Sequence, residues 1–164
     1  MTKQEIKAVK AYLYGIKRTE VAIINLTRAL EDLNTRIQSP PTWMSNPNAI
    51  AVCGGADGSK QESWVEFQDA YPERRQFLED QLADKRRKVE EYERTLAAMA
   101  EEGHWGTLAV QIVRYKYNMR VVPNRAIYLY HLFCTEEIFY RTHRRALQFF
   151  RDAVPHRIEK MTVS

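Results

Sequence analysis

Four residues near the end of the chain have side chains that can bind phosphate or hydrogen-bond to base edges: Tyr140, Arg141, Arg144 and Arg145. An arginine guanidinium presents a planar fork of N–H donors, which pairs with a phosphate or with O6 and N7 of guanine. A tyrosine hydroxyl can donate a hydrogen bond to a phosphate oxygen. Arg141 and Arg144 are three residues apart, so on a helix they share one side. These side chains indicate binding of a polyanion, with duplex DNA as the leading candidate.

A helix has to carry these residues, and residues 136–152 have the pattern of one. Thr135 is a favourable N-cap that also aims backbone amides at a bound phosphate, and Pro155 stops the helix at its other end. At 3.6 residues per turn, one side gathers residues suited to a core: Phe139, Thr142, His143, Ala146, Leu147 and Phe150. The opposite side presents Glu137, Tyr140, Arg141, Arg144 and Gln148, with Arg145 and Arg151 flanking it. The pattern predicts a helix with one buried face and one basic, exposed face.

Two shorter helices are predicted upstream, and with the last helix they form a predicted C-terminal domain over residues 107–154. The first covers about 107–118, after a break at Gly103, with Thr107 as its N-cap. The second covers about 124–132 and is joined to the last helix by a short turn. This order is the outline of a helix-turn-helix, whose second helix enters the major groove of DNA. The region also contains three arginines that are expected to contact phosphates: Arg114, Arg120 and Arg125.

The earlier part of the chain, residues 1–102, predicts a long antiparallel helical hairpin. Its first helix, 3–38, carries an imperfect heptad stripe and ends at two prolines. A loop rich in proline and glycine, 39–60, precedes a second helix that runs from about 62 to the end of the hairpin. The residues after the last helix, 155–164, are expected to be a polar tail. The predicted fold class is therefore all-α, with a hairpin followed by a small helix-turn-helix domain.

Polar residues interrupt the apolar stripes of the hairpin at four inward positions: Glu20, Thr27, Asn34 and Lys85. Polar residues in a helical seam cost stability but fix the register or the number of partners. A seam between only two helices buries little apolar surface, so further packing partners are needed. We expect a homo-oligomer formed through the hairpin.

Positive charge is concentrated in the last third of the chain. Residues 107–164 hold ten Lys/Arg and four Asp/Glu, a net charge of +6. The remaining residues hold 15 Lys/Arg and 17 Asp/Glu, a net charge of −2. A basic module attached to a slightly acidic one suggests two separate tasks, with the basic module a candidate polyanion binder.

Other chemistries find little support in the sequence. The cysteines and histidines lack the spacing of a metal site: Cys53, Cys134, His104, His131, His143 and His156. The segment 54–60, GGADGSK, lacks the spacing of a phosphate-binding loop, and neither cysteine has the context of a catalytic nucleophile. The chain contains no run of 18 apolar residues, which is the length needed to span a membrane. The N-terminus lacks the apolar core of a signal peptide. We expect a cytoplasmic protein that is not an enzyme and has no catalytic residue, metal or cofactor.

The segment 114–150 contains RYKY and, after a helix and a turn, CTEEIFYRTHRRALQFF. It resembles the C-terminal part of phage and prophage transcriptional regulators of the RinA/ArpU type, which itself resembles the C-terminal DNA-binding domain of sigma factors. The matching positions are Arg114, Tyr115, Leu132, Thr135, Tyr140, Arg141, His143, Ala146 and Leu147. Phe133 stands where that family has its turn glycine. The resemblance implies a transcriptional regulator that binds duplex DNA and whose hairpin either mediates oligomerisation or contacts RNA polymerase.

Two other functions stay open as alternatives. A small-terminase-like DNA-packaging protein would also combine a helix-turn-helix with oligomerising helices, but it would form a ring and bind a large ATPase subunit. A helical scaffold or adaptor would have no role with nucleic acid, and residues 135–150 would then be only the outer wall of a small core.

Overall fold

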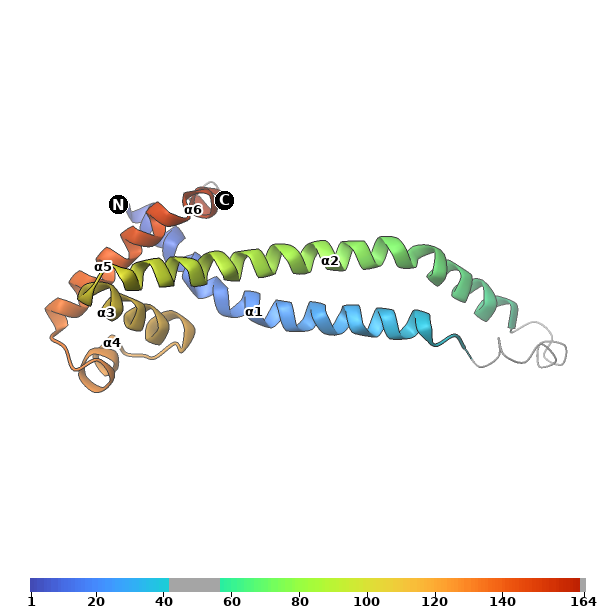
Figure 1. Ribbon diagram of the computed structural model, residues 1–164, viewed down its shortest axis with the longest axis horizontal. Coiled ribbons are helices and arrows are strands. Elements are labelled where there is room, and N and C mark those ends of the chain that lie inside the picture. The colour runs from blue at the N-terminus through green and yellow to red at the C-terminus, as the bar shows by residue number, and fades with distance from the viewer. Residues whose placement is uncertain (42–56, 163–164) are drawn as a thin grey trace. The chain divides into compact units, whose positions relative to one another are not determined.

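The computed structural model describes residues 1–41 and 57–162, in which every regular element is helical (Figure 1). In chain order the elements are α1 (Lys3–Gln38), α2 (Asp57–Glu101), α3 (His104–Val113), η2 (Arg114–Asn118), α4 (Asn124–Ala126), η3 (Ile127–His131), α5 (Glu136–Ala153) and α6 (Pro155–Thr162). The two η elements are short π-helical segments that continue α3 and α4. No strand occurs in the described ranges, so the predicted all-α fold class is confirmed. None of the helices in these ranges is long and apolar enough to cross a bilayer.

The chain forms two compact units. Unit 1 comprises Met1–Val21 and Arg87–Ser164, and unit 2 comprises Ala22–Arg86. The predicted domain boundary lies near residues 102–107 and stays a prediction. Helical periodicity alone does not reveal which helix ends are buried together. The charge follows the units: unit 1 has 18 Lys/Arg against 11 Asp/Glu, a net charge of +7. Unit 2 has 7 against 10, a net charge of −3.

The main core of unit 1 is built by the start of α1 and the end of α2 together with the C-terminal helices. Its buried members are Ala8, Val9, Tyr12, Leu13, Ile16, Tyr92, Leu96, Met99, Ala109, Val113, Tyr117, Ala146, Leu147, Phe150, Val154 and Ile158. Phe150 of α5 lies at its centre, with ring centroids 6.4 Å from Tyr12 of α1 and 5.8 Å from Tyr92 of α2. All six residues predicted for the inner side of the last helix are buried, which confirms that prediction.

A second, smaller core holds the shorter helices of unit 1 together. Ile112 of α3, Ile127 of η3 and Phe139 of α5 are fully buried in it. Six half-buried residues pack around them: Leu108, Tyr115, Val121, Tyr128, Leu132 and Cys134. This cluster packs α3 and η3 against the first turns of α5, and so positions the start of the predicted basic face.

The start of α3 differs from the sequence expectation. Thr107 is not an N-cap: α3 begins at His104, with Gly103 as the N-cap residue at φ 83°. A positive φ costs glycine little, so the chain turns sharply there and the new helix starts at once. Thr107 lies inside α3, and its backbone N–H donates to the Gly103 carbonyl at 3.1 Å.

Two further boundaries also differ from expectation. α2 begins at Asp57, five residues before the expected start, and continues through Pro72. Residues 155–162, expected to be a polar tail, form α6. The tail is helical because it has an apolar side: Ile158 is only 3% exposed and belongs to the main core of unit 1.

Unit 2 has a small core of its own, in which Leu33 of α1 packs with Trp64 and Phe67 of α2. The Tyr71 hydroxyl donates to Asn34 Oδ1 at 2.8 Å, and the Thr27 hydroxyl donates to the carbonyl of its own helix. Two of the polar seam residues are therefore satisfied within the chain. Most of the predicted loop, residues 42–56 with Cys53, lies outside the described residues, and 57–60 belong to α2.

Candidate nucleic-acid interface

The exposed face of α5 starts from a capped N-terminus. The Thr135 side-chain oxygen accepts a hydrogen bond from the Ile138 backbone N–H at 3.3 Å, so the predicted N-cap is confirmed. The Thr135 hydroxyl oxygen thus accepts a hydrogen bond from its own helix. Through this cap Thr135 helps to orient α5. Two acidic residues, Glu136 and Glu137, occupy the first turn and complement the helix dipole. An anion would therefore meet α5 along its middle turns rather than at its N-terminus.

The predicted outer residues of α5 lie together in one shallow hollow. It is lined by Glu137, Tyr140, Arg141, Arg144, Arg145 and Gln148. Arg141 and Arg144 are exposed, and within the described part of the chain neither makes an ion pair. Arg145 is held differently, since its guanidinium carbon lies 3.7 Å from the ring centroid of Trp105 in α3. That cation–π contact fixes one wall of the hollow, and Arg141 and Arg144 are its exposed cations without an ion-pair partner among the described residues.

Tyr140 connects α5 to the helices before it. Its hydroxyl accepts a hydrogen bond from Asn124 Nδ2 at 3.3 Å, and Lys116 Nζ donates to the Oδ1 of the same asparagine. The Tyr140 ring packs edge-on against Phe139 at 5.2 Å. The phenolic hydrogen of Tyr140 is then available to an acceptor outside the protein, such as a phosphate oxygen.

The other three predicted arginines lie elsewhere on unit 1. Arg114 is 3.7 Å from Glu93 of α2, and both side chains are about half exposed, a pair that adds little stability. Arg125 is exposed on α4. Arg120 is exposed after η2 at φ 55° and lines a second hollow with Arg18 and Lys116. The structure therefore brings together four of the predicted contact residues, and does not place Arg114, Arg120 and Arg125 in the same hollow.

Three residues near the predicted site are absent from the sequence expectation: Lys10, Lys116 and Asn124. Lys10 of α1 lines a third hollow with Tyr140, His143 and Arg144 of α5. Burial lowers the pKa of Lys116, and the nearby charge of Lys10 lowers it further. One signal was present in the sequence, since the first 21 residues hold five Lys/Arg against two Glu.

The inner side of α5 holds a buried polar pair. Tyr117 and His143 lie 2.8 Å apart from hydroxyl oxygen to Nε2. Burial, followed by the charges of Lys116 and Lys10, lowers the pKa of His143 to about 3. His143 is therefore a neutral core residue that positions α5. No group of three or more potential metal ligands occurs among the residues the structure describes.

The turn before α5 takes the conformation in which glycine is favoured. Phe133 has φ 49° and is 85% exposed. The Cys134 backbone N–H donates to the Tyr128 carbonyl at 3.0 Å, which closes the turn. A non-glycine residue in this region is strained by roughly 1–2 kcal/mol.

Phe133→Gly is expected to raise the free energy of unfolding by about 0.5–1 kcal/mol, because relief of this strain exceeds the extra chain entropy of glycine. The exposed ring contributes almost no packing. Thermal or urea unfolding checks this, with Phe133→Ala as the control, since it keeps the Cβ atom and should show no gain. A less stable Phe133→Gly variant would contradict the prediction.

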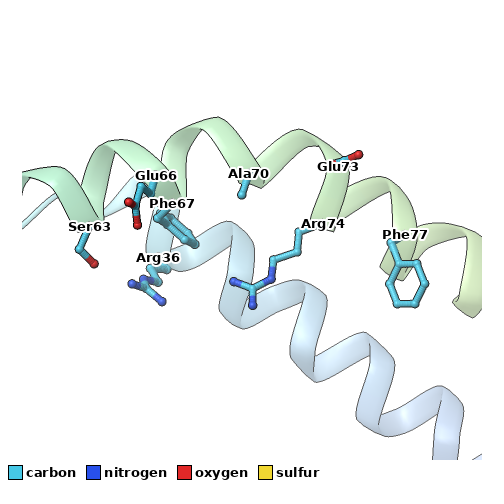
Figure 2. A pocket seen from close by; sticks show the side chains of 8 residues that line it. All are labelled: Arg36, Ser63, Glu66, Phe67, Ala70, Glu73, Arg74 and Phe77. Atoms are coloured by element: carbon cyan, nitrogen blue, oxygen red, sulfur yellow. The ribbon is translucent and has the colours of Figure 1, made fainter.

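A further hollow lies on unit 2, between the second half of α1 and the first half of α2 (Figure 2). It is lined by Arg36, Ser63, Glu66, Phe67, Ala70, Glu73, Arg74 and Phe77. The Arg36 guanidinium carbon lies 4.1 Å from the Phe67 ring centroid, and Phe77 is 62% exposed. In Figure 2 Phe67 and Arg74 point towards α1, whereas Glu73 points away. Its lining combines two arginines and two glutamates with two phenylalanine rings.

Comparison with known proteins adds no family: no protein-family model, curated protein or solved structure matches the chain.

Proposed function

We propose that unit 1 binds duplex DNA through α5, acting as the second helix of a helix-turn-helix formed by residues 124–150. The observation that carries the proposal is the division of α5 into two faces. One side is buried in the core, while Tyr140, Arg141 and Arg144 stand exposed in a row. Repulsion between two unpaired arginines one helical turn apart destabilises the fold. Binding of a polyanion would neutralise both charges and relieve this repulsion.

Three features of the turn and of α4 support this assignment. The residue at the position of the family's turn glycine, Phe133, has a positive φ. Thr135, one of the positions that match the resembled family, caps α5. Asn124 joins the start of α4 to Tyr140, so the two helices are held together at the exposed face.

The electrostatics of the units supports the same partner. Unit 1 carries a net charge of +7 and unit 2 a net charge of −3. A strongly basic unit attracts the phosphate backbone at long range and raises the association rate. The acidic unit repels it, so DNA would be directed to unit 1.

A transcriptional regulator of the phage type is the role that the resemblance favours. A packaging protein would share the DNA-binding face but assemble as a ring. The mass of the assembly in solution distinguishes such a ring from the smaller assembly of a regulator. The predicted antiparallel hairpin of α1 and α2, its self-association and its contact with RNA polymerase stay predictions. Because Thr27 and Asn34 are bonded within the chain, their polarity no longer argues for an oligomer.

Replacing Arg141 and Arg144 together with alanine is expected to weaken DNA binding. If each neutralises one phosphate, the slope of log affinity against log salt becomes shallower by about 1.8. If one of them reads guanine, preference at one base pair is lost as well, at about 1–3 kcal/mol. The measurement is a binding titration on a selected duplex at salt concentrations from about 0.05 to 0.2 M.

The matched control is the double replacement of Arg28 and Arg86 with alanine. Both arginines are exposed and belong to unit 2, so this variant loses the same charge without changing unit 1. We expect it to bind like the wild type. A folded Arg141→Ala, Arg144→Ala variant with wild-type affinity and slope would rule out α5 as the recognition helix.

A further inference from the structure

The start of α1 lies beside the cations of the C-terminal helices. Lys10 lines a hollow together with Tyr140 and Arg144 of α5. Eight residues further along α1, Arg18 lines another hollow together with Lys116 and Arg120. Residues about a hundred or more positions apart in the sequence thus form one basic surface of unit 1.

Acidic side chains are absent from the linings of these two hollows. The two glutamates of this part of α1 face other partners: Glu5 lies 3.9 Å from Arg151, and Glu20 lies 3.1 Å from Lys17. Lys10 and Lys116 are close enough for the charge of one to lower the pKa of the other. Like charges held together without an acid destabilise a fold unless a polyanion binds them.

This basic surface is continuous with the exposed face of α5. Tyr140, Arg144 and Gln148 line both the hollow on α5 and the one that contains Lys10. Lys116 is joined to Tyr140 through Asn124, and it also lines the hollow that contains Arg18. The cations therefore follow one another from Arg18 through Lys116 and Lys10 to α5.

We propose that Lys10 and Arg18 of α1 bind the phosphate backbone of the same duplex that α5 contacts. Lys116 and Arg120 belong to the same basic surface, because they line the hollow that contains Arg18. The inference rests on the proposed function and extends it: the DNA-binding part is the whole of unit 1 rather than residues 107–154. At 1.5 Å per residue, Lys10 and Arg18 are roughly 12 Å apart along the helix axis, so each meets a different phosphate.

The test is the double variant Lys10→Gln, Arg18→Gln in the full chain, titrated with a mixed-sequence duplex and with the selected duplex. We expect the slope against log salt to become shallower by about 1.8 and the affinity at 0.1 M salt to fall roughly 60-fold. The fall should be equal on both duplexes, because phosphate contacts carry no sequence information. Arg28→Gln, Arg86→Gln is the control with the same loss of charge.

The two proposals fail in different ways. If Lys10→Gln, Arg18→Gln binds like the wild type while Arg141→Ala, Arg144→Ala does not, the contribution of α1 is overturned and the role of α5 stands. If both double variants bind like the wild type, neither surface contacts DNA. Because Lys10 is half-buried, the single variant Arg18→Gln, at an exposed position, serves as a second measurement. It should lower the slope by about 0.9, and an unchanged slope would overturn the inference.

Discussion

Replacing Gly106 with alanine is expected to lower the free energy of unfolding by roughly 3 kcal/mol. Gly106 is buried in α3, next to the last turns of α2. A methyl carbon added there would lie 1.9 Å from the Met99 carbonyl oxygen and 3.2 Å from Glu102 Cβ. The first neighbour is backbone and cannot swing aside, so α3 has to move away from the end of α2. That movement would open the main core of unit 1.

The matched control is Gly15→Ala, inside α1. The nearest atom to an added methyl carbon there is Lys88 Nζ at 3.5 Å, an ordinary contact. Alanine has the higher helix propensity, so this variant should gain about 0.5–1 kcal/mol. Urea unfolding followed by circular dichroism measures both. Equal stability of Gly106→Ala and the wild type would show that α3 does not approach α2 this closely.

Acidification from pH 7 to pH 4 is expected to cost the wild type about 3 kcal/mol more than a His143→Gln variant. Burial lowers the pKa of His143 from its ordinary value of 6.5 to about 3. The unfolded chain therefore takes up a proton below about pH 6.5, while the folded chain does so only near pH 3. Stability is complete above pH 6.5, falls with decreasing pH and levels off below about pH 3.

His143→Gln removes the titrating group and keeps a side chain that can hydrogen-bond to Tyr117. Arg157 lowers the pKa of Glu91, whose protonation also destabilises the fold at low pH. That contribution is present in both proteins and cancels in the comparison. The measurement is urea unfolding at several pH values. Parallel stability curves for the two proteins would contradict a buried, neutral His143.

The sequence by itself was sufficient to predict that the chain is helical and to predict the two faces of α5. Helical periodicity is a local property, so Phe139, His143 and Phe150 were identified as inner residues without knowledge of what covers them. The cap at Thr135 and the exposure of Arg141 and Arg144 follow from the same local rules.

Conformations that depend on a neighbouring element were not predictable in this way. Thr107 has the chemistry of an N-cap, but α3 starts at His104, because Gly103 can take a positive φ. Phe133 takes a positive φ that its own side chain disfavours, in a turn that is closed by a backbone hydrogen bond from Cys134 to Tyr128. Residues 155–162 form α6 because Ile158 finds a place in a core built by other helices.

Only the tertiary structure decided which charges act together. In the sequence Arg114 and Arg145 are basic residues like Arg141. In the structure Arg114 lies beside Glu93 of α2, whereas the Arg145 guanidinium lies over the Trp105 ring. Lys10 and Arg18 are far from α5 in the sequence, and packing of α1 against the C-terminal helices brings them to the basic surface. Electrostatic energy depends on distances in space, and burial of apolar residues from distant segments sets those distances.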